Sequence, residues 1–255
     1  MSSMSKWHFP NKWKKHADLS KESFIKPYLP QTSILTKNNL WRYLSKYPSI
    51  FIKPTFGLGG TGIMKITRSG NTYILQSGIR KRKFNNRMNL SDFIQKVTHY
   101  RNYIVQQGIH LLTIHNRPVD FRVLLLKPKE EWRLMGTIGK VAAANRIVTN
   151  FHSGGKGLTL HRALMATRHF TPLQYNQTEQ KLSSVSLRIA NKFSQHYRHA
   201  RKLGLDFGID TNRKIWLLEA NTNPGYNLFK IHHNKALFKR IERTTQYITR
   251  IQRNI

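Results

Sequence analysis

The 255-residue sequence lacks cysteine, has few acidic residues and contains no long apolar run. Without cysteine it can form no disulfide, zinc ribbon or thiol nucleophile. This fits a reducing compartment, so we expect a cytoplasmic protein. No apolar run approaches the roughly 18 residues that a membrane span needs, and the first 15 residues lack the apolar stretch of a secretory signal. The sequence therefore predicts neither a membrane span nor export by a standard signal.

The shortage of acidic residues leaves a large positive charge. Lys and Arg number 44, whereas Asp and Glu number only 11, which gives a formal net charge of +33. This imbalance predicts an acidic partner: nucleic acid, an anionic polymer, a phosphorylated ligand or a membrane surface. The charge alone does not choose among them. Because 39% of the residues are hydrophobic and 11% are aromatic, we expect a globular chain rather than a disordered one.

Hydrophobic periodicity predicts a mixture of strands and helices. Strands are expected at 49–54, 103–109, 119–126, 132–141, 203–209 and 215–220, and a hairpin is expected around Ser69-Gly70-Asn71. Helices are expected within 17–47, broken at Pro27 and Pro30, and at 89–100, 178–203 and 237–251. Gly204 should stop the long helix. Hairpins dominate over repeated βαβ units, so we predict an α+β fold of two lobes that meet near residue 108.

A glycine-rich loop contains Gly57, Gly59 and Gly62 in the spacing G-x-G-x-x-G, four residues after Lys53. A dinucleotide-binding fingerprint would open a helix, whereas these glycines open a strand. A Walker A loop would place Lys-Ser or Lys-Thr directly after its last glycine, whereas here Ile63 and Met64 follow Gly62. Two alternatives remain. The loop is either a flap over phosphate groups with Lys53 beneath it, or a tight hairpin that binds nothing.

Asp206, Phe207 and Gly208 match the metal-binding tripeptide of protein kinases, which also use a glycine-rich flap. However, no His-Arg-Asp catalytic loop precedes Asp206 and no Ala-Pro-Glu follows it. Lys53 also precedes the glycines instead of following them on a later strand. The sequence therefore disfavours a protein kinase.

The segment 203–225 carries a sharper chemical signal. If its two strands fold back about residues 212–213, residues pair where their numbers sum to 425, so Asp206 faces Glu219. Opposed like charges destabilise a sheet, so something positive is expected between them. Asn221 shares the face of Glu219 and adds an amide oxygen, and such a donor set suits Mg²⁺. The alternative is that ordinary salt bridges to basic neighbours neutralise the pair.

Several motifs occur in one order along the chain: Lys53 before the glycine flap, VQQGI, Asp120-Phe121-Arg122, VTNFHSGGKG and LEANTNPG. With them, and with residues 11–35, the chain resembles the ATP-grasp superfamily. Within it, the chain looks most like the YheC/YheD group of endospore coat-associated proteins. The resemblance implies an ATP-grasp fold of two α/β lobes with ATP and Mg²⁺ between them. It implies an N-terminal lobe with the flap at 1–108 and a C-terminal lobe with the metal site at 109–255. Many ATP-grasp enzymes carry an additional N-terminal domain that helps to bind the acceptor, and in departure from that pattern we expect no separate domain before the ATP-grasp lobes here.

The resemblance also implies roles for individual residues. Lys53 matches the strand lysine that contacts nucleotide phosphates, Lys12 is the candidate for the earlier one, and Arg122 matches the arginine near the transferred phosphoryl group. The flap is matched by Gly57, Gly59, Gly60, Thr61 and Gly62, and the hinge that faces adenine is matched by Gln107, Gly108 and Ile109. A loop asparagine is matched by Asn150. The magnesium ligands are matched by Asp206, Glu219 and Asn221.

Simpler alternatives stay open for some of these residues. Arg122 could only neutralise Asp120 on its own strand, and Asn150 could be a turn residue. Lys140 and Arg146 lie in the region that matches before the second glycine-rich loop, but in so basic a chain we expect them to be surface charges.

The resemblance implies an ATP- and Mg²⁺-dependent ligase. A carboxylate attacks the γ-phosphate, and an amine or thiol captures the resulting acylphosphate. The acidic or carboxylate substrate is unidentified. An anionic spore polymer and non-specific nucleic acid are both compatible with the charge. The alternative function, from a different class, is a spore-coat structural or binding protein that keeps the ATP-grasp fold without turnover.

Overall fold

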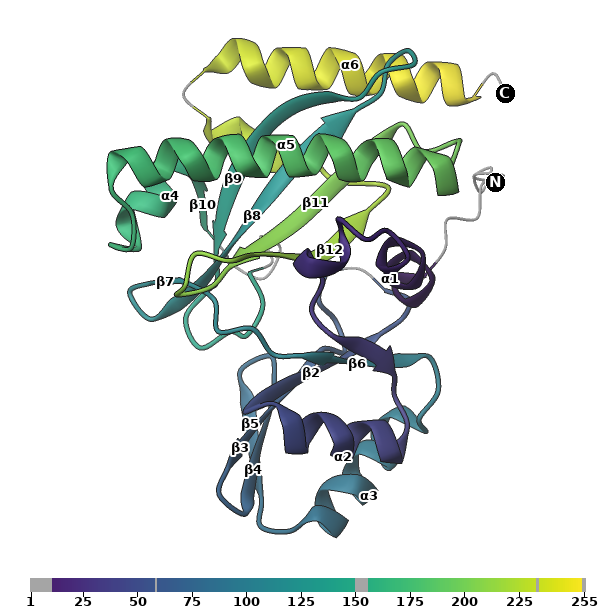
Figure 1. The fold of residues 1–255 in the computed structure, drawn as a ribbon, viewed down its shortest axis with the longest axis vertical. Coiled ribbons are helices and arrows are strands. Elements are labelled where there is room, and N and C mark those ends of the chain that lie inside the picture. Colours follow the sequence, from purple (N-terminus) through teal and green to yellow (C-terminus); the bar gives the residue numbers. More distant parts are fainter. Residues whose placement is uncertain (1–10, 58, 150–155, 233, 254–255) are drawn as a thin grey trace.

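The computed structural model describes residues 11–57, 59–149, 156–232 and 234–253. The chain folds into two lobes, each built on an antiparallel sheet, with the N-terminal lobe below the C-terminal lobe in Figure 1. Helices pack on both sheets. The fold is therefore α+β, as the periodicity of the sequence predicts.

The N-terminal lobe has a six-stranded sheet in the order β1-β6-β2-β3-β4-β5. Its elements are β1 (Thr32–Ile34), α2 (Lys37–Lys46), β2 (Ser49–Pro54), β3 (Met64–Ser69), β4 (Thr72–Ser77), β5 (Arg80–Phe84), α3 (Arg87–Thr98) and β6 (Tyr103–Gln107). Both helices pack on one face of the sheet, where Leu40, Ile52 and Ile94 are fully buried. Because side chains alternate along β2, Phe51 and Lys53 point to the opposite face.

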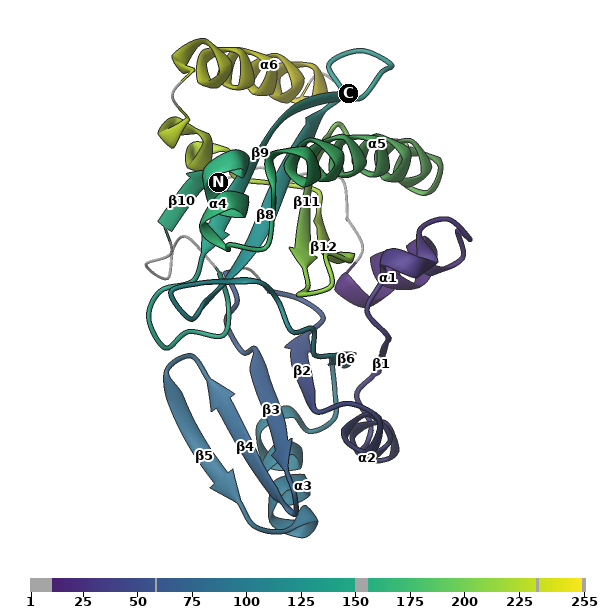
Figure 2. The ribbon, with the colours of Figure 1, turned by 60° about the vertical axis from the view of Figure 1, so that its left-hand side comes forward.

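The C-terminal lobe has a sheet in the order β10-β9-β8-β11-β12, and the short β7 pairs with β8. Its elements are β7 (Thr113–Ile114), β8 (Arg117–Leu126), β9 (Arg133–Val141), β10 (Lys156–Thr159), α4 (Leu160–Ala166), α5 (Pro172–His196), β11 (Lys202–Ile209), β12 (Ile215–Asn221), η3 (Asn227–Ile231) and α6 (Lys235–Arg253). Helices α4 and α5 cover one face and α6 covers the other (Figures 1 and 2). Alternation along β8 supplies both cores, since Phe121 packs with α5 and Leu124 with α6.

The first described segment lies between the lobes and contacts both. It contains α1 (Lys12–Ser20) and the 3-10 helix η1 (Lys26–Tyr28). Leu19 and Ile25 are buried in the C-terminal core, while the backbone N–H of Lys12 donates to Thr55 O of the N-terminal lobe at 2.9 Å. Residue 108 therefore falls between the two sheets, but the segment before β1 joins the C-terminal lobe by its packing.

The long helix of the C-terminal lobe differs from its prediction at both ends. The sequence predicts a helix over 178–203, whereas α5 begins six residues earlier and ends at His196. A capping box starts it: Thr171 accepts from the N–H of Gln174, and the Gln174 side chain accepts from the N–H of Thr171. The prediction that Gly204 stops this helix is wrong, since Gly204 lies within β11.

The other predicted elements are largely present. The strand predicted at 49–54 is β2, the predicted hairpin is β3 with β4, and the pair predicted at 119–126 and 132–141 is β8 with β9. The break at Pro27 and Pro30 is confirmed, because η1 contains Pro27 and α2 begins only after Pro30. The strand β1 was not predicted, and its three residues are too few to show a period.

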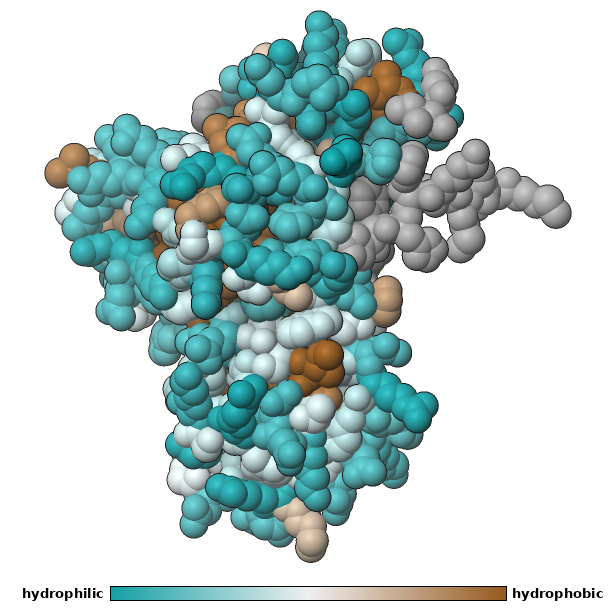
Figure 3. All heavy atoms as spheres, turned by 45° about the vertical axis from the view of Figure 1, so that its right-hand side comes forward, coloured by the Kyte–Doolittle hydropathy of each residue, from teal (hydrophilic) through white to brown (hydrophobic). Residues whose placement is uncertain are grey.

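The surface agrees with the composition of the sequence. Most of the face shown in Figure 3 is hydrophilic, and apolar residues appear on it only in small patches. Within the described ranges, no helix combines the length and the apolar character that crossing a membrane requires.

Candidate nucleotide and metal site

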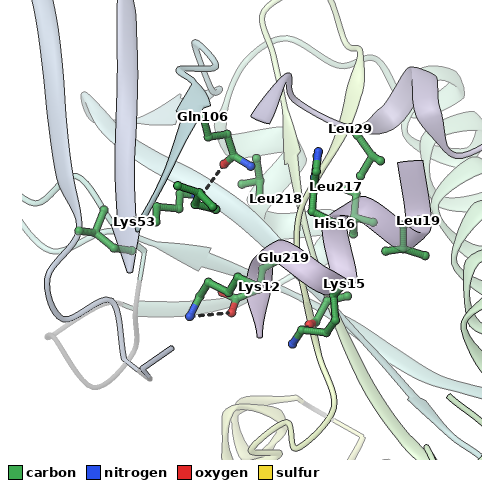
Figure 4. Close-up of a pocket in the computed structure, with 13 residues that line it drawn as sticks. Lys12, Lys15, His16, Leu19, Leu29, Lys53, Gln106, Leu217, Leu218 and Glu219 are labelled. Carbon is green, nitrogen blue, oxygen red and sulfur yellow. Dashed lines mark hydrogen bonds and ion pairs between the residues drawn. The ribbon is translucent and has the colours of Figure 1, made fainter. Parts of the chain in front are cut away.

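A pocket lies between the two lobes, beside α1 (Figure 4). The N-terminal lobe contributes side chains of β2 and β6, and the C-terminal lobe contributes side chains of β12. Apolar side chains such as Ile104 and Leu217 form part of its wall. The charged and amide groups that line it are Lys12, Lys15, Lys53, Gln106 and Glu219. An apolar wall with a few polar groups is typical of a small-molecule site.

Lys53 brings a positive charge into this pocket from β2. Its Nζ donates to Gln106 Oε1 at 2.6 Å, and Gln106 Nε2 donates in turn to Thr32 Oγ1 at 3.0 Å. Burial lowers the pKa of Lys53, although the nearby Glu219 carboxylate acts in the opposite direction. Because the hydrogen-bond partner of Lys53 is a neutral amide, its charge is available to an anion such as a phosphate group.

Lys12, the first residue of α1, connects the two sides of the pocket. Its Nζ donates to Gly57 O at 2.8 Å and lies 3.7 Å from Glu219 Oε1. The two lysines that the resemblance assigns to nucleotide phosphates, Lys12 and Lys53, thus line the same pocket. His16 lines it as well, and burial together with the Lys53 charge lowers the pKa of His16 to about 4. His16 is therefore neutral at pH 7.

The glycine-rich loop joins β2 to β3, which pair as antiparallel strands, so the glycines do precede a strand as predicted. Its four described glycines have φ between 73° and 114°, which side chains rarely adopt: Gly57, Gly59, Gly60 and Gly62. A Cβ on Gly60 would lie 3.2 Å from Val148, so the loop approaches the C-terminal lobe closely. Thr61 is exposed. The loop therefore joins two strands of the N-terminal lobe and meets the C-terminal lobe at Val148.

The predicted adenine-facing hinge lies beside the pocket. Gln107, Gly108 and Ile109 are not among the pocket residues, whereas Gln106, one position earlier, is. The N–H of Gln107 donates to Gln31 O at 2.8 Å, and the N–H of Gly108 donates to Ser49 O at 2.9 Å. These bonds fix the path of the chain where it leaves the first sheet. The other predicted nucleotide contact, Asn150, lies outside the described residues.

The strands β11 and β12 bring the predicted carboxylates together. Asp206 is directly opposite Glu219, which confirms the predicted register at this position. A bulge shifts the register after Asp206, so Phe207 faces Leu217 and the sum of 425 is wrong nearer the turn. Asn221 shares the face of Glu219, and its Oδ1 accepts a 2.9 Å hydrogen bond from the N–H two residues later.

A row of charged side chains crosses the sheet here. Arg122 on β8 pairs in register with Asp206 on β11, which pairs with Glu219 on β12. Arg122 Nε and Nη2 donate to the two Asp206 oxygens at 2.5 and 2.8 Å. Burial would raise the pKa of Asp206, but the charges of Arg122 and Lys140 outweigh burial and hold that pKa well below its usual range. Asp206 is therefore an ionised carboxylate with protein cations as partners.

Two further members of this cluster were not predicted as site residues. Lys140, expected at the surface, is only 8% exposed, and its Nζ lies 3.0 Å from Asp120 Oδ1 and 3.1 Å from Asp206 Oδ1. Asp120 Oδ2 accepts a hydrogen bond from Thr149 Oγ1. Lys140, not Arg122, is the cation paired with Asp120. The sequence signal that could have revealed this pair is strand register, because Asp120 and Lys140 lie directly opposite each other across the β8–β9 hairpin.

The donor set fits Mg²⁺ in part. Glu219 and Asn221 offer oxygen ligands, and the Glu219 side chain is 39% exposed with one long ion pair to Lys12. An ion at Asp206 would have to replace Arg122 or Lys140, since both carboxylate oxygens are already engaged. No group of three His, Cys, Asp or Glu side chains suited to a metal occurs in the part of the chain that the structure covers. An ion here would therefore draw further ligands from Asn221 and from nucleotide phosphates.

Comparison with protein families gives a match to the model described as YheC/D like ATP-grasp, over residues 2–250. Two curated relatives come from Bacillus subtilis (strain 168). The endospore coat-associated protein YheD is 30% identical over 244 residues, covering 91% of this chain and 52% of the relative. The endospore coat-associated protein YheC is 24% identical over 225 residues, covering 85% and 60%. The chain thus spans little more than half the length of these relatives.

Solved structures of low sequence identity share the fold. D-cycloserine synthetase DcsG matches with a TM-score of 0.55 at 10% identity, covering 93% of this chain and 70% of that one. The ADP complex of PurK, an N5-carboxyaminoimidazole ribonucleotide synthetase, matches with a TM-score of 0.52 at 12% identity, covering 92% and 51%. The ATP-grasp ligase PsnB with a minimal precursor matches with a TM-score of 0.51 at 12% identity, covering 93% and 60%.

Proposed function

The chain belongs to the YheC/D-like ATP-grasp family, and from this premise we propose that it is an ATP- and Mg²⁺-dependent ligase. In the proposed reaction a carboxylate oxygen of the substrate attacks the γ-phosphorus of ATP, and ADP leaves. An amine or thiol then attacks the acyl carbon of the acylphosphate, loses its proton and releases phosphate. The observation that carries this proposal is the convergence of Lys12, Lys53 and Glu219 in one pocket between the lobes.

The proposed roles follow from the positions of the side chains. Lys53 and Lys12 would hold the nucleotide phosphates from β2 and α1, and the N–H groups of the glycine-rich loop would close over them. Arg122, at the start of the charged row, would stabilise the charge that develops on the transferred phosphoryl group. Bound Mg²⁺ would be held by Glu219 and Asn221, and by Asp206 where the ion replaces Arg122 or Lys140, and it would neutralise the phosphate charge.

Calorimetry with Mg·ATP tests the nucleotide site. We expect binding by the wild-type chain and a Kd raised by about tenfold or more in Lys53→Ala and Glu219→Ala, because each loses a charged contact. Lys239→Ala, an exposed lysine on α6, is the matched control and should bind as the wild type does. No binding by the wild type, or equal binding by all variants, would remove the proposal.

Release of ADP tests turnover. Candidate carboxylates are combined with candidate amines or thiols, and ADP is measured with and without the second substrate. A ligase should release ADP at a rate that depends on a carboxylate, and its product should contain the new acyl bond. The proposed substrate is an acidic or carboxylate compound drawn to the net charge of +33, and an anionic spore polymer is the proposed example.

A second candidate function is a non-catalytic spore-coat binding protein with the same fold. One observation favours it: protein cations pair with both carboxylates, Arg122 and Lys140 with Asp206 and Lys12 with Glu219. The curated relatives bear the name endospore coat-associated protein, so we propose synthesis in the cytoplasm and association with the spore coat. Unchanged localisation to spores in an Asp206→Asn, Glu219→Ala double variant would support this function. Acceptor-dependent ADP release would count against it.

A further inference from the structure

The strand β5 forms one edge of the N-terminal sheet and is unusually basic. It lies at the end of the strand order, beyond β4, and Figure 2 shows it at the outer margin of the lower lobe. Four of its five residues are basic and exposed: Arg80, Lys81, Arg82 and Lys83. In the described structure β5 pairs only with β4, so its second edge is open to another strand.

The side chains of β5 divide between the two faces of the sheet. Phe84 is buried against the helices, and Arg82 lies on the same face, with its guanidinium 4.6 Å from the ring centroid of Phe93. By the two-residue period of a strand, Lys81 and Lys83 point to the opposite face. Positive charge is therefore present on both faces of this edge.

Few carboxylates of the N-terminal lobe are available to offset this charge. Residues 31–108 contain thirteen Lys and Arg but one acidic residue, Asp92. The ion pairs found in the described structure involve none of the four basic residues of β5. A charged edge discourages pairing with neutral strands, but the same charge favours pairing with a strand that carries carboxylates.

The backbone of the edge can be assigned from the turn before it. Gly78, with φ of 59°, and Ile79 form a two-residue loop between β4 and β5. In such a hairpin the residues flanking the loop, Ser77 and Arg80, exchange both hydrogen bonds, and the pairs then alternate. The N–H and C=O groups of Lys81 and Lys83 consequently point away from β4, toward the open edge.

We propose that β5 is a docking edge for an extended acidic peptide segment, which adds to the sheet as a further strand. Outward N–H and C=O groups would pair with its backbone, and carboxylates at alternate positions would meet the basic side chains on each face. A polyanion without a peptide backbone could use only the side-chain charges. This inference goes beyond the proposed ligase activity and does not depend on it, because β5 contributes nothing to the cleft pocket.

The first experiment measures the affinity of the full chain for a fluorescein-labelled octapeptide in which glutamate and threonine alternate. Lys81→Glu with Lys83→Glu should weaken binding by about tenfold or more, because two attractive pairs become repulsive. Lys239→Glu with Arg243→Glu on α6 changes the net charge equally at exposed positions far from β5 (Figure 1), and should weaken binding much less. An equal loss of peptide affinity in both double variants would overturn the proposal that the peptide binds at β5.

The second experiment tests the backbone. Lys81→Pro removes the same charge as Lys81→Ala and also removes an N–H that points outward, away from the β4 ladder. Strand addition predicts that the proline variant binds the peptide about three- to tenfold more weakly than the alanine variant, because one backbone hydrogen bond to the peptide is lost. Equal affinities would overturn strand addition and leave only polyanion-like attraction.

Circular dichroism and thermal unfolding identify the variants that fold. If Lys81→Pro does not fold, the same comparison is made between Lys83→Pro and Lys83→Ala, whose N–H also points outward. An octapeptide with glutamine in place of glutamate is the probe control. The proposal expects it to bind at least about tenfold more weakly than the acidic peptide, and similar affinity for both peptides would overturn the role of charge.

Discussion

Lys53 combines two properties that oppose each other. Burial penalises its charged form and lowers its pKa, and its hydrogen-bond partner Gln106 provides no compensating negative charge. A half-buried charge whose direct hydrogen-bond partner is neutral contributes little to folding, and the proposed phosphate ligand would give it a negative partner. The stability of the chain and its binding of nucleotide should therefore respond in opposite directions when this charge is removed.

We expect Lys53→Met to raise the free energy of unfolding by about 1 kcal/mol, because the apolar length is kept and a half-buried charge is lost. The Kd for Mg·ATP should rise by about tenfold or more. Urea unfolding and calorimetry measure the two quantities. Lys65→Met, on the same sheet face but outside the pocket, is the control and should leave ATP binding unchanged. Lower stability together with unchanged ATP binding would contradict the proposed role.

The residues of the site were predictable to different degrees. The pairing of Asp206 with Glu219 was predicted from a fold-back about residues 212–213. Beside the turn, however, Phe207 pairs with Leu217, and the bulge between Asp206 and Phe207 brings Asp206 opposite Glu219. The turn therefore predicts that the two carboxylates lie close together, whereas their direct pairing depends on the bulge. The residue type of Lys140 does not predict its burial, because nothing in the composition shows which of the 44 basic residues lies inside the fold. Only its register opposite Asp120, across a second hairpin, distinguishes it. The pairing of Arg122 with Asp206 joins β8 to β11 across a sequence separation of 84 residues, and no local pattern predicts such a pair.

At the level of elements, Gly204 shows how an amphipathic pattern can mislead. The spacing of apolar residues continues past the end of α5 because the chain after it re-enters the same core. A glycine at the end of such a pattern then resembles a helix stop. In the structure Gly204 lies in β11, where a Cβ would be 2.7 Å from Pro224 Cβ and 3.2 Å from Arg122 Cδ. Glycine is required there for close packing.

Gly204→Ala should therefore destabilise the fold by about 1–3 kcal/mol, since the added methyl group overpacks a tight contact. Gly225→Ala is the matched control, because a Cβ there meets nothing within 4 Å, and its effect should stay within about 0.5 kcal/mol. Urea unfolding of both variants measures the difference. A Gly204→Ala variant as stable as the wild type would show that the contact with Pro224 relaxes easily.

Asp18 ties α1 to Tyr197, the residue directly after α5, and so anchors the segment that lies between the lobes. Its carboxylate accepts from Tyr197 Oη at 2.5 Å and pairs with Lys14 at 3.0 Å and Lys21 at 3.2 Å. Burial would raise the pKa of Asp18, but these hydrogen bonds outweigh burial and lower that pKa from 3.8 to about 2. A lowered folded-state pKa stabilises the fold at pH values above the ordinary pKa.

We expect Asp18→Asn to lower the free energy of unfolding by about 1–2 kcal/mol at neutral pH, since the charge-assisted bonds are lost. The stabilisation is complete above about pH 4 and disappears as the pH falls toward about 2, because the wild-type carboxyl then protonates. Urea unfolding of both chains across this range measures the difference between them. A difference that stays constant from neutral pH to pH 2 would contradict the assignment.

At the level of the whole molecule, the two-lobed α+β arrangement was predictable because each sheet consists largely of hairpins that leave local signals. The position of the first segment was not, since its contacts join residues far apart in sequence. Lys12 reaches Thr55, and Asp18 reaches Tyr197. Long-range packing of this kind has no periodic signature, so the sequence does not predict which lobe this segment packs against.

The charge of +33 also makes a prediction for the molecule as a whole, since acidic residues are too few to offset 44 basic ones in any large region of surface. We expect binding to double-stranded DNA without sequence preference. Contact with about six phosphates should lower the affinity by about a thousandfold between about 50 and 200 mM salt. Fluorescence anisotropy with two unrelated duplexes measures this. Lys53→Met should bind DNA as the wild type does, because Lys53 is half-buried and lines the pocket between the lobes. Loss of ATP binding with retention of DNA binding would then separate the specific site from the general surface charge. An affinity insensitive to salt would mean that DNA is held by something other than this charge.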